Sequence, residues 1–69
     1  MFLPRLKDLR EDREMRQIDV AMLLRISQVQ YSRYECGVRD LPIKHLVTLA
    51  KFYKVSTDYI LGLTNKPNH

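Results

Sequence analysis

Residues 27–37 read SQVQYSRYECG, a stretch that carries the signals of both a helix start and a helix end. Ser27 is a preferred residue for capping the start of a helix, and Gln30 stands where a capping-box side chain reaches back to the cap. Gly37 is a typical left-handed residue just past a helix end. The stretch therefore predicts a short capped helix over residues 28–36. Two aromatic residues three positions apart share its inward face: Tyr31 and Tyr34.

A second helical pattern lies immediately before this one. Its apolar spacing predicts a helix from Gln17 to Leu24 or Arg25. The side expected in the core carries Val20, Ala21 and Leu24. About three residues separate the two helices, so the chain must turn sharply between them. A helix, a tight turn and a capped helix are the sequence outline of a helix-turn-helix.

Helical spacing continues on both sides of this unit. A first helix is expected to run to about Arg13, with Pro4 in its opening turn. Its apolar face carries Leu3, Leu6 and Leu9. Pro42 fits the first turn of a fourth helix. The buried stripe expected for that helix is Ile43, Leu46, Leu49, Ala50 and Tyr53.

The end of the chain predicts one more short helix. Val55 is expected to fill a loop, and Ser56 to cap a helix over residues 57–61 that Gly62 closes. The whole pattern predicts an all-α fold of five helices. We expect residues 1–63 to form one helix-turn-helix domain. The remaining residues, 64–69, are expected to be a C-terminal tail, frayed from Asn65 to His69.

Composition favours a polyanionic partner and gives no sign of catalysis. The 69 residues carry twelve Lys and Arg against eight Asp and Glu, a formal net charge of +4. Positive charge favours nucleic acid because neutralised phosphates release their counterions. No paired carboxylates, phosphate-cradling glycine loop or activated nucleophile stands out, so we expect no enzyme and no cofactor.

Cysteine and hydropathy patterns bear on location and on metals. Cys36 is the one cysteine, which excludes an intrachain disulfide and suits a reducing cytoplasm. With only His45 and His69 as nitrogen ligands, it makes no zinc site. No apolar run approaches the roughly 20 residues that span a bilayer. The start of the chain is too short in apolar residues for a secretory signal. We therefore expect a cytoplasmic protein with no membrane partner.

From Gln17 onward the chain resembles the phage repressor and Cro type of helix-turn-helix protein, the Xre-like family. The residues that carry this likeness are Gln17, Ala21, Ile26-Ser27, Tyr31-Ser32-Arg33-Tyr34-Glu35, Gly37, Leu49-Ala50 and Val55-Ser56-Thr57-Asp58-Tyr59-Ile60-Leu61-Gly62. The likeness implies a compact five-helix bundle of the phage-repressor DNA-binding type. It also implies that residues 28–36 form a recognition helix, which docks in the major groove of double-stranded DNA.

The resemblance implies which side chains face the duplex. Gln28, Val29 and Arg33 would face the groove, with Gln30 and Ser32 next in line. Glutamine can pair with adenine, valine can contact a thymine methyl, and arginine can bind guanine or a phosphate. If Gln30 closes the capping box, its side chain is occupied instead. Phosphate contacts are expected from Gln17, Arg39 and Lys44.

The resemblance also implies one structural ion pair, and the chain departs from the family in three places. Arg10 and Glu35 match family positions that pair the first helix with the recognition helix. Arg25 stands where a glycine usually makes the turn, so it must adopt a left-handed conformation or the turn differs. Arg16 replaces the usual Ser or Thr cap, and Asp19 is its expected substitute. Apolar residues occupy commonly polar positions at Ile18, Met22 and Leu23.

Two functional hypotheses follow. The first is a transcriptional regulator, expected to be a repressor, that binds a two-fold operator as a homodimer. Its dimer contacts would involve Tyr59, Ile60 and Leu63, unless these residues only cover the core. The second is an antitoxin or protein-interaction module of the same fold. Its partner would bind the apolar strip of Ile18, Met22 and Leu23, for which extra core burial is the alternative.

Overall fold

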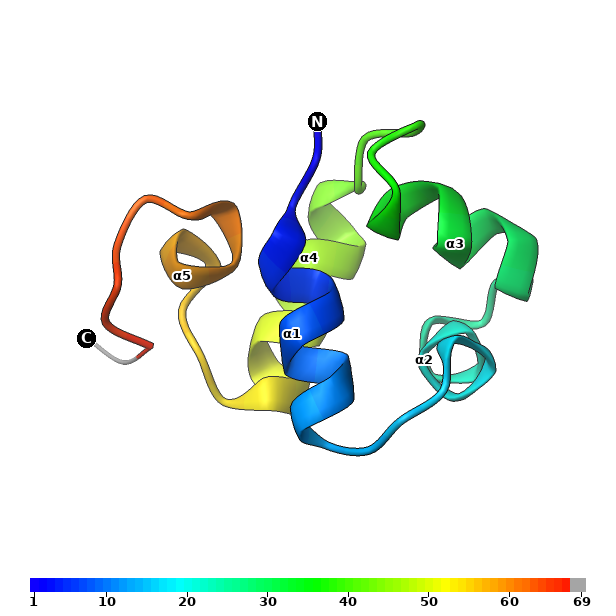
Figure 1. The fold of residues 1–69 in the computed structure, drawn as a ribbon, viewed down its shortest axis with the longest axis horizontal. Helices are drawn as coiled ribbons and strands as arrows, with labels where there is room; N and C mark the ends of the chain where they lie inside the picture. The colour runs from blue at the N-terminus through cyan, green and yellow to red at the C-terminus, as the bar shows by residue number, and fades with distance from the viewer. Residues whose placement is uncertain (68–69) are drawn as a thin grey trace.

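A computed structural model describes residues 1–67 of the chain, and that part contains five α-helices and no strand. The helices are α1 (Pro4–Asp12), α2 (Gln17–Leu24), α3 (Gln28–Glu35), α4 (Ile43–Tyr53) and α5 (Thr57–Leu61). This confirms the all-α prediction. None of these helices combines the length and the apolar character needed to cross a membrane. In the view of Figure 1, α1 lies in front of α4 in the centre, with α2 and α3 on one side and α5 on the other.

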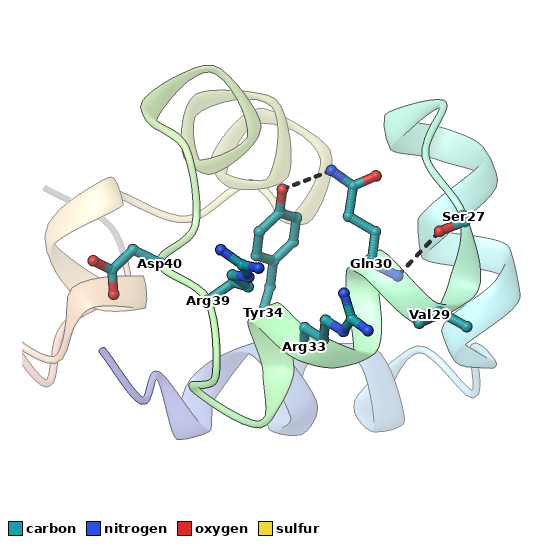
Figure 2. A pocket seen from close by; sticks show the side chains of 7 residues that line it. All are labelled: Ser27, Val29, Gln30, Arg33, Tyr34, Arg39 and Asp40. Atoms are coloured by element: carbon teal, nitrogen blue, oxygen red, sulfur yellow. Dashed lines mark hydrogen bonds between the residues drawn. The ribbon is translucent and has the colours of Figure 1, made fainter.

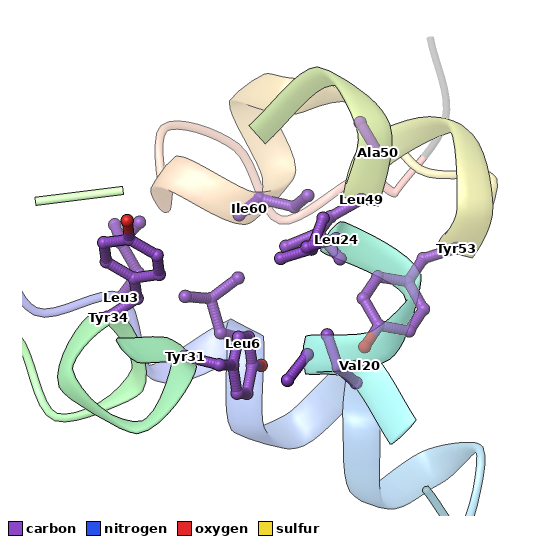
Figure 3. Packing of buried hydrophobic residues seen from close by; sticks show 11 residues of the cluster. Leu3, Leu6, Val20, Leu24, Tyr31, Tyr34, Leu49, Ala50, Tyr53 and Ile60 are labelled. Carbon is purple, nitrogen blue, oxygen red and sulfur yellow. The ribbon is translucent and has the colours of Figure 1, made fainter. Parts of the chain in front are cut away.

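The core draws one fully buried side chain from every helix. In chain order these side chains are Leu6, Val20, Tyr31, Leu49 and Ile60, each at most 1% exposed. Figure 3 shows them among the other members of the same cluster. Burying a side chain of this size contributes roughly 1.5–3 kcal/mol, so no helix of the bundle can leave without a large loss of stability.

The turn between α2 and α3 depends on a left-handed residue and on a serine cap. Arg25 has φ 59° and ψ 42°, so this residue takes the conformation that a glycine would adopt more easily. The N–H of Ile26 then donates to the carbonyl of Ala21 at 3.0 Å. Ser27 Oγ accepts the N–H of Gln30 at 3.1 Å. The predicted cap at Ser27 is confirmed, and of the two alternatives for Arg25 the left-handed conformation is the one observed.

The second half of the predicted capping box is wrong. The side chain of Gln30 does not reach back to Ser27 but donates from Nε2 to the hydroxyl of Tyr34, at 3.1 Å. Tyr34 lies one turn further along α3, where residues four apart are neighbours on the helix surface. A phenolic oxygen within reach therefore competes with the cap for this amide.

Asp19 substitutes for the missing Ser or Thr cap of α2, as predicted. Its carboxylate accepts the N–H of Arg16 at 2.8 Å and also pairs with the guanidinium of Arg16 at 3.0 Å. Both bonds lie at the positively polarised end of the helix, where a carboxylate is stabilising. The hydrogen bond from Arg16 lowers the pKa of Asp19.

The buried stripe of α4 differs from the prediction at its first residue. Ile43 is 78% exposed, while His45 is only 8% exposed. Ile43 is the first residue of α4, and the apolar side chains buried from this helix, Leu49, Ala50 and Tyr53, all lie further along it. Counting Ile43 in the core was therefore wrong, because periodicity alone does not reveal where a helix extends past its neighbours.

A buried ion pair joins α1 to the end of α3. Arg10 donates from Nε and from Nη2 to the two carboxylate oxygens of Glu35, each at 2.9 Å. The two side chains are 12% and 5% exposed. The third nitrogen, Nη1, donates to the carbonyl of Met15 at 2.9 Å. Such a two-pronged arrangement fixes both distance and orientation between the partners.

The predicted frayed tail is wrong for residues 65–67. The guanidinium of Arg5 donates to the carbonyls of Tyr59 and Thr64 and, at 2.8 Å, to Oδ1 of Asn65. The N–H of Ser56 donates to the carbonyl of Pro67 at 2.7 Å. An arginine has five donors in a fixed fork, which explains how one side chain fastens three segments. The rest of the predicted tail, 68–69, lies outside the described residues.

Replacing Arg25 by glycine is expected to stabilise the fold. Removing the Cβ from a left-handed residue relieves a conformational cost of about 1–2 kcal/mol, part of which the greater freedom of unfolded glycine cancels. The net gain should be about 0.5–1 kcal/mol in the free energy of unfolding, measured by urea denaturation. Arg25→Ala keeps the Cβ and is the matched control. Equal stabilities of the two variants would contradict the explanation.

Replacing Glu35 by glutamine is expected to destabilise the fold strongly. The charge of Arg10 would remain buried without its partner, which typically costs on the order of 3–5 kcal/mol. Thermal and urea unfolding would measure the loss. Arg16→Ala removes the exposed ion pair with Asp19 and should change stability little. A small effect of Glu35→Gln would mean that the buried pair contributes no more than a surface one.

The same pair makes stability depend on pH. Burial alone would raise the pKa of Glu35, but the hydrogen bonds that its carboxylate accepts, first of all from Arg10, and the charge of Arg10 together outweigh burial and leave the pKa below the ordinary 4.5. A depressed pKa gives stability that is complete above 4.5 and is lost as the pH falls through the lower folded value. The stability difference between the wild-type chain and Glu35→Gln should therefore shrink below pH 4.5 in urea titrations. A difference that stays constant from pH 7 to pH 3 would contradict this.

Candidate nucleic-acid interface

The two faces of α3 have opposite roles. Its inward face carries Tyr31, Tyr34 and Glu35, each at most 6% exposed. The residues predicted to read bases lie elsewhere on the helix surface: Gln28, Val29, Gln30 and Arg33 are exposed, and Ser32 is half-buried. Val29 is 62% exposed although it is apolar. Because the inward side chains are packed in the core, α3 presents its outer face from a fixed position.

A hollow of about 620 Å³ opens on this outer face. Figure 2 shows the seven residues that line it: Ser27, Val29, Gln30, Arg33, Tyr34, Arg39 and Asp40. Three predicted base-reading residues thus meet Arg39, a predicted phosphate contact, around one hollow. Gln28, Ser32 and Gln17 do not line it. The lining combines cationic, amide and apolar groups, with Asp40 as its acidic member.

A second hollow, of about 500 Å³, lies between the helix-turn-helix and α4. Lys44, another predicted phosphate contact, lies at the start of α4 and lines this hollow together with Arg25. Gln30 and Tyr34 line both hollows. Two cations therefore line the hollow beside α3. The sequence analysis had considered Arg25 only as a residue of the turn.

Gln17 has a structural attachment besides its predicted role. Its Nε2 donates a long hydrogen bond, 3.4 Å, to Oε1 of Glu35. Gln17 is also the first residue of α2, whose leading N–H groups have no partner within the helix. A phosphate at this end would meet those backbone donors and the second amide hydrogen of Gln17. The contact of Gln17 with DNA stays a prediction.

The predicted dimer residues do not share one environment. Ile60 is 1% exposed and packs in the core, which favours the alternative that this residue only covers the core. Leu63 is 73% exposed, and Tyr59 is half-buried with its ring under the guanidinium of Arg5, 4.0 Å away. Of the two aliphatic residues of α5, Ile60 is buried in the core, and Leu61 packs against the core while partly exposed.

The apolar strip of α2 is only partly on the surface. Met22 is 69% and Leu23 38% exposed, whereas Ile18 is half-buried. The three residues therefore do not all fit one explanation, either a surface for a protein partner or extra burial in the core. Met22 and Leu23 remain available to a partner, and Ile18 contributes in part to packing.

Sequence reasoning missed the role of Tyr34, on the inward face of α3, as a hydrogen-bond acceptor. Tyr34 was expected only to fill the core, yet its hydroxyl accepts the hydrogen bond from Gln30. His45 on α4 lies beside it, with the two ring centroids 6.1 Å apart. Burial, together with the charge of Lys44, lowers the pKa of His45. The sequence did offer one signal for this hydrogen bond: position 34 carries a tyrosine, which has a hydroxyl group, and not an aliphatic residue.

Comparison with known proteins points to one family. Residues 6–60 match the helix-turn-helix family. The chain is 38% identical over 68 residues to YobD of Bacillus subtilis, described as an uncharacterised HTH-type transcriptional regulator; the match covers 99% of this chain and 61% of YobD. It is 40% identical over 58 residues to the HTH-type transcriptional regulator ImmR of the same organism, over 84% of this chain and 46% of ImmR.

A third relative, YqaE of Bacillus subtilis, is 34% identical over 61 residues, and the match covers 88% of this chain and 53% of YqaE. YqaE too is described as an uncharacterised HTH-type transcriptional regulator. The chain thus spans about half to three-fifths of the length of the relatives it matches. No solved structure matches it significantly.

Proposed function

The chain belongs to the helix-turn-helix family of the phage repressor and Cro type, and on this premise we propose that it binds a specific double-stranded DNA sequence with α3 in the major groove. The observation that carries the proposal is the outer face of α3. Val29, Gln30 and Arg33 line one hollow there, on a helix whose inner face is packed in the core. A rigid helix with exposed hydrogen-bonding side chains is what groove readout requires.

Each exposed side chain has a chemical partner in the groove. Gln28 can bond adenine through N6 and N7, and the exposed methyls of Val29 can contact a thymine methyl. Arg33 can bond O6 and N7 of guanine or a phosphate. Ser32 is half-buried and has a short side chain, so it reaches less far toward the bases than the other three residues. These contacts give sequence preference.

Cations and helix ends around α3 supply the contacts that do not depend on sequence. Arg39 stands at the rim of the α3 hollow, and Lys44 and Arg25 stand at the rim of the neighbouring one. Gln17 lies at the N-terminus of α2, where backbone N–H groups attract anions. In this arrangement phosphates on both sides of the groove have donors, which sets the register of the protein on the duplex.

We further propose that two copies bind one two-fold operator. The described chain measures 31 Å along its longest axis, close to the roughly 34 Å that separates successive major grooves on one side of DNA. Two adjacent copies can therefore place their α3 helices in neighbouring grooves. Leu63, with Tyr59 beside it, is the exposed apolar residue near α5 that supports a contact between copies.

The regulator would act by occupying its operator. A protein that covers a promoter excludes other proteins from it, which favours repression over activation. The lone Cys36 agrees with the reducing cytoplasm in which such a regulator would work.

A second function, binding of a protein partner as in an antitoxin, is favoured by one observation. Met22 and Leu23 are exposed on α2, outside the hollow on α3. Apolar side chains in such a place mark interaction surfaces when they are contiguous. Met22→Gln, which adds no charge, should then weaken binding of that protein while leaving DNA affinity unchanged.

Selection of bound sites from random duplex DNA tests the main proposal. On the selected site, Gln28→Ala and Arg33→Ala should each weaken specific binding about 5- to 150-fold, the equivalent of about 1–3 kcal/mol, and weaken non-specific binding much less. Arg39→Ala should weaken all sequences alike and reduce the slope of log affinity against log salt by about 1. Lys7→Ala, on the exposed face of α1, is the control.

If Gln28→Ala and Arg33→Ala each weakened binding to the selected duplex and to all other sequences by the same factor, base readout would be contradicted. A purified chain that ignores every duplex at low ionic strength would refute DNA binding altogether. In that case the protein-interaction function would take its place.

A further inference from the structure

The side chain of Gln30 is held by a hydrogen bond within the free protein. Its Nε2 donates to the hydroxyl of Tyr34 at 3.1 Å, across one turn of α3 (Figure 2). Gln30 itself is an exposed residue, and exposed glutamines usually turn freely about three side-chain bonds. Here one end of the amide is tied to a residue that belongs to the core.

Tyr34 is well placed to act as an anchor. It is 6% exposed, and its ring lies 6.1 Å from the ring of His45 at an angle of 49°. Packing against α4 therefore fixes the direction of its hydroxyl. Because Tyr34 and Gln30 line both hollows, that hydroxyl lies at the boundary between the core and the surface beside α3.

The hydrogen bond leaves a defined set of groups on Gln30. A glutamine amide has two N–H donors and one carbonyl acceptor. With one N–H bonded to Tyr34, the carbonyl oxygen and the second N–H remain. In the major groove only adenine presents a donor next to an acceptor, N6 and N7, for such a pair. Guanine offers two acceptors, cytosine a donor and thymine an acceptor, so each can form only one of the two bonds.

We propose that Tyr34 is a positioning residue that holds the amide of Gln30 to read an adenine in the major groove. The inference rests on the proposed function, since it concerns the same face of α3. Val29 and Arg33 line the same hollow as Gln30, so the adenine lies within the base pairs that those two residues contact. Tyr34 touches no DNA in this arrangement and acts only through Gln30.

Holding the amide in advance raises discrimination because a loose side chain would adapt to several bases. A glutamine that is free to turn forms one good hydrogen bond with any base edge. A fixed one forms two bonds with adenine and meets a mismatched edge with the other bases. Preorganisation of this kind improves binding to one partner by lowering the freedom lost on contact.

Tyr34→Phe tests the proposal because it removes the hydroxyl and keeps the ring. Binding is measured for the selected duplex and for variants that carry each of the other three base pairs at every position. We expect Tyr34→Phe to reduce the preference for adenine at one position about 5- to 10-fold and to leave the other positions unchanged. Gln30→Ala should affect the same position, and adding Tyr34→Phe to it should change nothing further.

Tyr53→Phe is the matched control. Tyr53 is also buried in the core, and its hydroxyl makes no hydrogen bond within the described part of the chain. Its loss should alter no base preference. Thermal unfolding of both variants would show whether the core is intact, so that a change in DNA reading is separated from a change in folding.

A measurement on the free protein tests the anchor separately. The side-chain amide protons of Gln30 should exchange with solvent more slowly in the wild-type chain than in Tyr34→Phe, as seen by NMR. Equal exchange would overturn the anchor whatever the protein binds.

Three results with DNA would overturn the inference. These are a uniform loss of affinity in Tyr34→Phe, an unchanged adenine preference, or a position sensitive to Gln30→Ala that prefers another base. Binding of the selected duplex with any of these results would leave the proposed function standing. Failure of the wild-type chain to bind any duplex would overturn both.

Discussion

The buried pair of Arg10 and Glu35 is the interaction on which the rest of this small structure depends. Glu35 is the last residue of α3, and it receives hydrogen bonds from α1 through Arg10 and from α2 through Gln17. One carboxylate therefore fixes the end of the outward-facing helix against both helices that precede it. Because the charges are almost completely buried, the pair tolerates little displacement before it loses its hydrogen bonds.

The core and the outer face of α3 constrain each other in turn. Tyr31 and Tyr34 supply the large inward side chains that anchor the helix, and residues beside them in sequence project outward. A helix of eight residues has little stability of its own, so its position is decided by packing and by the serine cap. The same helix consequently contributes side chains to the core and to the exposed surface. Tyr34 connects the two, because its ring is buried and its hydroxyl accepts a hydrogen bond from the exposed Gln30.

Sequence reasoning succeeded where a local rule has a single outcome. The cap at Ser27 follows from one residue and its near neighbours. The resemblance to the family pointed to Asp19 as the substitute cap and to Arg25 as the residue of the turn. It failed where two outcomes were locally equivalent. Gln30 had both a cap and a hydroxyl within reach, and only the packing of Tyr34 against α4 brought that hydroxyl into position. Ile43 fitted the period of α4 but lies at the exposed start of that helix.

The sequence by itself determined the five helices, their order and the tight turn, because hydrophobic spacing and capping residues act over a few positions. The likeness of its motifs to a family indicated which helix faces outward. Tertiary packing was needed to know which side chains meet around the hollows, how Arg5 binds residues 64–65 and how deeply Ile60 is buried. These features join residues far apart in the chain, and their geometry depends on how whole helices pack, which no local pattern specifies.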